Sequence, residues 1–151
     1  MKRTSMEGQI CSVARSLDVI GDWWSLLIVR DALAGLRRFG EFQRNLGAAK
    51  NILTTRLRTL VAEGILETAP ASDGSAYLEY RLTDKGRALA PVLIALSQWS
   101  SAHIFQQDEM CVVPTDKKNM QPLKPLGMES SDGRPLSLDD VHFSLGPDDV
   151  A

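Results

Sequence analysis

The stretch FGEFQRNLGAAKNILTTRLRTLVAEG, residues 39–64, decides the fold. Apolar residues at its start recur at helical spacing and predict a short helix over 38–46, carried by Phe39, Phe42 and Leu46. The small residues at 47–49 predict a tight turn. A longer helix is predicted over 50–63, with Gly64 at its end. The residues of this helix that we expect to be buried are Ile52, Leu53, Leu57, Leu60 and Val61.

The hydrophobic pattern changes period directly after the longer helix. Residues 65–69 and 77–82 read as short β-strands, and the loop between them is rich in turn-forming residues, including Asp73-Gly74. This pattern predicts a β-hairpin. Thr83 follows it and is well placed to cap a further helix.

Helices are also predicted on both sides of this central part. A short helix is expected over 12–20, and Asp22 is a good N-cap for a helix over 23–34. That second helix is apolar almost all round, which predicts a central, buried element: Trp23, Trp24, Leu26, Leu27, Ile28, Val29 and Leu33. A last long helix is predicted over 84–105, although Pro91 can kink or interrupt it.

A helix, a turn and a helix followed at once by a hairpin are the order of a winged helix-turn-helix. We therefore predict a mainly α fold with a small β-hairpin wing, an α+β class, with extra helices at both ends. Residues 10–105 would form this domain, and residues 106–151 an acidic extension interrupted by prolines. The extension could be a small β-like addition, a surface for a ligand or partner, or a partly disordered segment.

The charge of the chain is unevenly distributed. The overall net charge is −2, but residues 37–58 carry six basic residues against Glu41 alone, a net +5. Residues 106–151 carry a net −5. A local basic stretch, not the mean, sets the field that a phosphate backbone meets. The acidity of the extension argues against its touching DNA.

The predicted helix over 50–63 offers a polar face opposite its leucines. That face carries donors and hydroxyls suited to phosphates and base edges: Lys50, Asn51, Thr54, Thr55 and Arg58. Arg37 and Arg38, before the preceding helix, are placed to grip phosphates. Such residues often form only a solvated face, but their clustering favours DNA binding over a protein-interaction adaptor. The wing tip, residues 72–75, has no basic residue, so we expect the wing to position the protein on DNA more than to read the base sequence.

The predicted helix over 84–105 suggests that the chain packs against a second protein surface. Its apolar residues have no later helix to cover them: Leu93, Leu96, Trp99 and Phe105. They either pack back on the core of the same chain or meet a second copy, and we prefer the homodimer. An operator with two half-sites requires such two-fold symmetry.

Several separate motifs, in order, resemble the HxlR-type transcriptional regulators over roughly residues 10–105. They are CSVARSLDVIGDWWSLLIVRD at 11–31, RFGEF at 38–42, LTTRL at 53–57, EGIL at 63–66 and YRLTDKG at 80–86. The resemblance implies a bacterial DNA-binding regulator that dimerises through residues 12–20 and 84–105, which adds Val13 and Leu17 to the dimer residues.

The resemblance also bears on two positions of the recognition helix. It places Arg56 at the family's recurring arginine, so Arg56 joins the DNA-binding residues, with a core salt bridge as its rival role. Ala49-Lys50 stands where many members have Ser-Pro, and without a strong N-cap the first turn of the helix is expected to fray.

Cys11 lies where some members of that family carry a redox-sensing thiol, so it is a possible redox sensor; we prefer a packing role for it in the dimer interface. Cys11, His103, Cys111 and His142 lack the spacing of metal ligands, so no metal site is predicted. A thiol-dependent enzyme using Cys11 or Cys111 is a rival reading. The sequence, however, has no phosphate-binding loop, no nucleophile elbow and no local Cys–His pair. We therefore expect no catalytic residue and no cofactor.

The predicted function is a sequence-specific DNA-binding transcriptional regulator, a repressor by preference, which acts as a homodimer and responds to a small ligand or to thiol oxidation. A winged-helix adaptor is the main alternative. No apolar run approaches the roughly 18 residues that span a bilayer, and the N-terminus has no signal-like apolar region. We therefore expect a cytoplasmic protein without a membrane partner.

Overall fold

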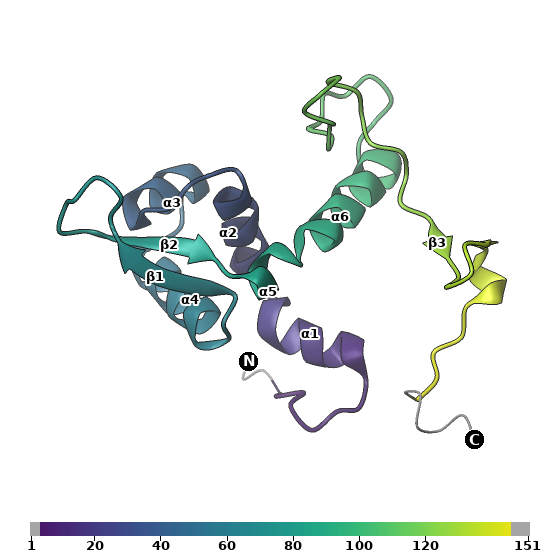
Figure 1. The fold of residues 1–151 in the computed structure, drawn as a ribbon, viewed down its shortest axis with the longest axis horizontal. Coiled ribbons are helices and arrows are strands. Elements are labelled where there is room, and N and C mark those ends of the chain that lie inside the picture. The colour runs from purple at the N-terminus through teal and green to yellow at the C-terminus, as the bar shows by residue number, and fades with distance from the viewer. Residues whose placement is uncertain (1–3, 146–151) are drawn as a thin grey trace. The chain divides into compact units, whose positions relative to one another are not determined.

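The computed structural model describes residues 4–145, so the end of the acidic extension, 146–151, lies outside the described residues. The chain forms two compact units that divide between Leu93 and Ile94. The expected boundary after residue 105 stays a prediction. The elements, most of them labelled in Figure 1, run as follows: α1 Ser12–Ile20, α2 Trp23–Leu33, α3 Phe39–Leu46, α4 Lys50–Ala62, β1 Leu66–Pro70, β2 Leu78–Leu82, α5 Asp84–Arg87, α6 Ala90–His103, β3 Met128–Glu129, β4 Pro135–Leu136 and the 3₁₀ helix η1 Leu138–Asp140.

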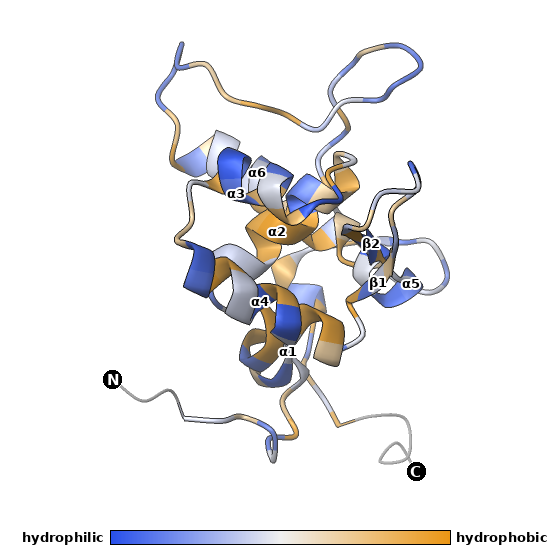
Figure 2. Ribbon diagram, turned by 90° about the vertical axis from the view of Figure 1, so that its left-hand side faces the viewer, coloured by the Kyte–Doolittle hydropathy of each residue, from blue (hydrophilic) through white to orange (hydrophobic). Residues whose placement is uncertain are grey.

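Helix α2 is the centre of the N-terminal unit and contacts α3, α4 and β2. Asp22 caps it as predicted, because its carboxylate accepts hydrogen bonds from the backbone N–H groups of Trp24 at 2.8 Å and Ser25 at 3.0 Å. Ile28 and Val29 are fully buried. Figure 2 shows hydrophobic colour along this helix, while α4 has both hydrophilic and hydrophobic sides.

Burial of α2 on all sides was wrong. Trp23 is 87% exposed and Leu33 is 40% exposed. Both lie at the ends of the helix, and the main packing face of α2 is the one toward α3, α4 and β2. An apolar residue outside that face therefore stays in solvent despite its type.

Helices α3 and α4 confirm the predicted helix, turn and helix. Gly47 ends α3 with φ +64°, a conformation that favours glycine. Leu53, Leu57 and Leu60 of α4 are buried, as predicted, but Ile52 is 38% exposed and that expectation was wrong. Ile52 precedes Leu53 and so points about 100° away from the leucine face. Helix α4 also begins without a side-chain cap at Ala49.

The predicted hairpin is confirmed as the antiparallel pair β1–β2. Its register places Leu66 opposite Leu82 and Thr68 opposite Tyr80. Leu66 and Leu82 are buried in the same core as the α4 leucines, and Tyr80 meets Phe42 edge to face at 6.5 Å between ring centroids. The wing is thereby fastened to α3 and α4.

A single long helix over 84–105 was wrong, and the interruption allowed for at Pro91 is the form present. The chain instead forms the short helix α5, capped by the Thr83 hydroxyl, which accepts from the Gly86 N–H at 3.1 Å, and then α6. Pro91 explains the break, because its ring would clash with the carbonyl four residues earlier, that of Arg87, where α5 ends. In the first turn of α6, proline is tolerated.

The C-terminal unit begins at Ile94 and so contains most of α6 and the acidic extension. The Gln98 side chain holds the extension to α6, since its amide donates to the Lys124 carbonyl at 2.9 Å and accepts from the Leu126 N–H at 2.8 Å. Strands β3 and β4 pair antiparallel. The extension thus contains a small β addition, one of the three forms left open. Of the helices in the described part, none combines the length and the apolar character needed to cross a membrane.

Candidate nucleic-acid interface

Helix α4 carries the candidate interface on the side opposite its buried leucines. Lys50, Asn51, Thr55 and Arg58 are exposed, and Thr54 is half-buried. Because Leu53, Leu57 and Leu60 are almost completely buried, α4 cannot rotate about its axis without exposing its apolar face. The fold therefore fixes which side chains of this helix face solvent.

The threonine hydroxyls on α4 bond back to their own helix. Thr54 Oγ1 donates to the Lys50 carbonyl at 2.8 Å, and Thr55 Oγ1 donates to the Asn51 carbonyl at 2.9 Å. Their hydroxyl protons are therefore engaged, while the oxygens can still accept and the methyl groups stay available for apolar contact. These are properties suited to base edges that donate and to the methyl group of thymine.

The basic side chains of α4 differ in whether they form ion pairs with carboxylates. Within residues 4–145, neither Lys50 nor Arg58 makes an ion pair. Arg56, by contrast, places its Nε 3.4 Å from an Asp22 carboxylate oxygen. The salt-bridge role left open for Arg56 is the one present, and it joins α4 to the start of α2.

Asp22 is charged in this contact. Burial acts to raise the pKa of Asp22, but hydrogen bonds from Ser25 and Trp24, together with the charge of Arg56, outweigh burial and leave the pKa below its ordinary value. The ionised carboxylate can therefore serve two helices at once, as cap of α2 and as partner of α4.

Arg37 and Arg38 are tied to the wing. The Arg38 guanidinium forms an ion pair with Asp73 at the wing tip and lies 6.0 Å from the centroid of the Tyr77 ring. Arg37 Nη1 lies 3.9 Å from a Glu79 carboxylate oxygen, a looser approach. The sequence showed the acid at the wing tip, but its pairing with an arginine 35 positions earlier was missed. The opposite charges of Arg38 and Asp73 were the only available signal for this pairing.

Glu79 anchors the base of the wing. It is only 3% exposed and accepts hydrogen bonds from the Ser72 N–H at 3.0 Å, the Ser72 hydroxyl at 2.8 Å and Arg81 Nη2 at 3.0 Å. The bonds from Ser72, followed by that from Arg81, lower the pKa of Glu79 to about 2. Sequence reasoning did not identify this buried carboxylate.

The low pKa of Glu79 predicts a pH dependence of stability. Because the folded pKa is about 2 and the ordinary value is 4.5, Glu79 stabilises the fold at pH above about 4.5, and this contribution is lost as the pH falls toward about 2. Replacing Glu79 by glutamine should lower the free energy of unfolding at neutral pH and flatten its fall over this window, measured by urea denaturation at a series of pH values. Glu67→Gln, an exposed position on β1, should follow the parent curve; identical curves for parent and Glu79→Gln would contradict the assignment.

The proposed dimer residues lie on α1, on α6 and just after α6. Val13 and Leu17 on α1, and Leu96 and Trp99 on α6, are about half exposed. Leu93 packs partly against the core, and Phe105 is half-buried. Cys11 is exposed at the N-cap of α1, and Cys111 Sγ donates to the Ser101 hydroxyl at 3.5 Å. Between residues 4 and 145, no three His, Cys, Asp or Glu side chains gather as metal ligands would.

Comparison with known proteins agrees with this geometry. A family model described as HxlR-like helix-turn-helix matches residues 19–108. An HTH-type transcriptional regulator of Mycobacterium bovis, Mb3122, is 43% identical over 93 residues, which are 62% of this chain and 59% of that protein. The match thus spans less than two thirds of that relative's length.

Solved structures extend the likeness to most of the chain. The crystal structure of PA1607, described as a candidate transcription factor, is 52% identical with a TM-score of 0.88, and the match covers 93% of this chain and 99% of that one. The redox regulator HypR in its oxidized form is 32% identical with a TM-score of 0.57, over 64% of this chain and 100% of that one. The family match and these likenesses show that the chain belongs to the HxlR-like helix-turn-helix family of transcriptional regulators.

Proposed function

We propose that this chain binds duplex DNA sequence-specifically, with α4 as the recognition helix, and regulates transcription as a homodimer. The observation that carries this proposal is the outward face of α4, held in place by Leu53, Leu57 and Leu60. An α-helix with its side chains is about 10–12 Å across, which fits a major groove about 12 Å wide, and the 13 residues of α4 make it about 20 Å long.

Each side chain of the proposed interface has its own role. Asn51 can make two hydrogen bonds to adenine, while Thr54 and Thr55 offer oxygens and methyl groups to neighbouring bases. Arg58 and Lys50 provide cations for phosphates. Arg37 is more available than Arg38, because Arg38 has to exchange the Asp73 carboxylate for a phosphate before it contributes.

The homodimer would give two copies of α4 on one operator. Apolar side chains on α1 and α6 that stay about half exposed in one chain support a partner surface made by a second copy: Val13, Leu17, Leu96 and Trp99. Two recognition helices would then read half-sites about one helical turn apart. Nothing in this arrangement requires a catalytic residue, and we assign none.

A thiol input is a second proposal, supported by Cys11. Its side chain is exposed at the N-cap of α1, within reach of an oxidant in solution, and the similar protein HypR is named a redox regulator. Selecting genomic fragments with the purified protein, with and without reductant, tests this input together with the half-site spacing. Identical selected fragments and affinities in both conditions would remove Cys11 from the proposal.

The DNA proposal is tested most directly by Arg58→Gln. Loss of one phosphate contact should weaken binding to a random-sequence duplex and reduce the slope of log affinity against log salt by about 0.9, measured by fluorescence anisotropy over a salt series. Arg87→Gln removes an exposed arginine of α5 and is the matched control, which should bind as the parent does. An Arg58→Gln protein with the parental slope would refute the assigned interface, and a parent indifferent to DNA at low salt would refute DNA binding itself.

A further inference from the structure

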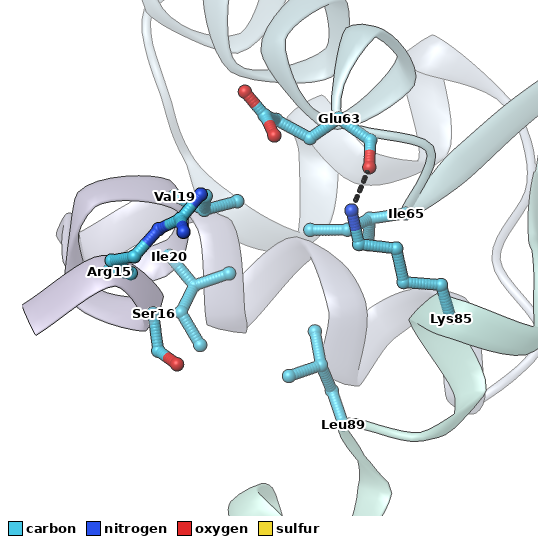
Figure 3. A pocket seen from close by; sticks show the side chains of 8 residues that line it. All are labelled: Arg15, Ser16, Val19, Ile20, Glu63, Ile65, Lys85 and Leu89. Carbon is cyan, nitrogen blue, oxygen red and sulfur yellow. Dashed lines mark hydrogen bonds between the residues drawn. The ribbon is translucent and has the colours of Figure 1, made fainter. Parts of the chain in front are cut away.

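A cavity of about 330 Å³ lies between α1, the segment that follows α4, and the α5 region (Figure 3). All of its lining belongs to the N-terminal unit. Its apolar walls come from Val19 and Ile20 of α1, Ile65 before β1, and Leu89 after α5. The volume is at the lower end of the range for small-molecule sites, which are mostly apolar with a few fixed polar groups.

Two cations border this apolar space, one from each side. The Arg15 guanidinium reaches it from α1, and the Lys85 ammonium reaches it from α5 (Figure 3). Lys85 Nζ donates to the backbone carbonyl of Glu63 at 2.5 Å, so part of its bonding capacity is used. In the described part of the chain, Arg15 makes no ion pair. With the Glu63 carboxylate included, the lining carries a net charge of +1.

We propose that this cavity binds a small organic carboxylate with an apolar body. The guanidinium fork of Arg15 matches a carboxylate with two parallel hydrogen bonds, and Lys85 adds a second positive charge. The walls formed by Ile20, Ile65 and Leu89 favour a hydrocarbon or aromatic body over a hydrated inorganic anion. A neutral apolar molecule would fill the same space but leave the net charge of +1 on the lining uncompensated.

The location of the cavity links ligand binding to the proposed recognition helix. Glu63 is the C-cap residue of α4 and Ile65 lies two residues after it, while Arg15 and Ile20 belong to α1, a proposed dimer helix. A carboxylate held between them would fix α1 relative to the end of α4. This regulatory part rests on the proposed DNA-binding function, and coupling would be reciprocal: the ligand changes DNA affinity by the factor by which DNA changes ligand affinity.

The test measures ligand binding without DNA. Isothermal titration calorimetry of the full chain with benzoate, 4-phenylbutyrate and decanoate should show saturable binding of at least one of them, and about tenfold weaker binding of its neutral amide, a difference of about 1.4 kcal/mol. The Arg15→Gln variant should likewise bind the carboxylate about tenfold more weakly than the parent does. Arg87→Gln, an exposed arginine on α5 outside this cavity, should leave binding unchanged.

A second variant tests the cavity without changing the charge of its lining. Ser16 lines the cavity from the exposed side of α1, so Ser16→Phe should fill the space and abolish binding while circular dichroism shows a folded protein. No binding of any of the three carboxylates, equal binding of acid and amide, or full affinity in Arg15→Gln would overturn the proposal. Because these readouts contain no DNA, a failed DNA-binding assay leaves them intact, and their failure leaves the recognition helix untouched.

Discussion

Replacing Leu57 by alanine is expected to lower the free energy of unfolding by about 2–5 kcal/mol, the range for a buried leucine whose removal leaves a cavity. Leu57 is 1% exposed and lies in the core that α4 shares with α2 and β1. The change removes the middle of the three leucines that orient α4. DNA binding should therefore weaken too, because the helix that presents Asn51 and Arg58 is less firmly held.

Urea denaturation, monitored by circular dichroism, measures the loss of unfolding free energy. Fluorescence anisotropy with a labelled duplex measures the weakening of DNA binding. Ile52→Ala is the matched control, since it truncates an aliphatic residue of the same helix that is partly exposed. We expect the control to lose clearly less stability than Leu57→Ala, because less apolar surface leaves contact with the core. Equal losses at the two positions would mean that α4 is not oriented by its leucine face.

The local signals in this sequence are enough to predict most of the helices. Gly21 and Asp22 bound α1 and α2 where expected, because a cap acts on its own neighbouring residues. The spacing of Leu53, Leu57 and Leu60 likewise predicts the buried side of α4, since three leucines at helical spacing leave one consistent face. The break before α6 depends on Pro91, and composition alone does not say whether proline kinks a helix or ends it.

Side-chain burial at the edges of the core was less predictable. Trp23 and Ile52 are apolar, yet Trp23 is 87% exposed and Ile52 is 38% exposed, because the elements of the described residues leave their helix surfaces partly or largely open. Whether a residue is covered depends on where other elements pack, which hydrophobic period does not specify. The same two residues could be buried in an assembly with no change to the pattern.

For the candidate site, the orientation of α4 could be predicted, but the availability of its cations could not. Arg38 and Arg58 are the same residue type in the same basic stretch, and within residues 4–145 only Arg38 of the two meets a carboxylate, that of Asp73 in the wing. The pairing joins residues far apart in sequence and exists only after the hairpin folds back on α3. A count of basic residues therefore overstates the number of cations free to bind phosphate.

The close approach of α5 to the beginning of β1 leads to the last prediction, Gly86→Ala. A Cβ added at Gly86 would lie 2.2 Å from the Ile65 carbonyl oxygen and 2.8 Å from Leu82 Cδ2. The carbonyl cannot withdraw freely, because it accepts a hydrogen bond from the Thr83 N–H at 3.1 Å. We expect a loss of stability of about 1–3 kcal/mol or more, the range for inserting an atom into packed structure.

Gly40→Ala provides a control of opposite sign for this change. At Gly40, in α3, a new Cβ would meet only Arg44 Nη1 at 3.8 Å, an ordinary contact. Alanine gives the unfolded chain fewer backbone conformations than glycine does, and it fits the helical conformation of this position. The free energy of unfolding of this variant should therefore rise by about 0.4–1 kcal/mol. Urea denaturation of both variants checks the pair. A Gly86→Ala protein as stable as the parent would show that the α5 segment can move away from Ile65 without loss, and the cavity that Lys85 and Leu89 line would then have no fixed wall on that side.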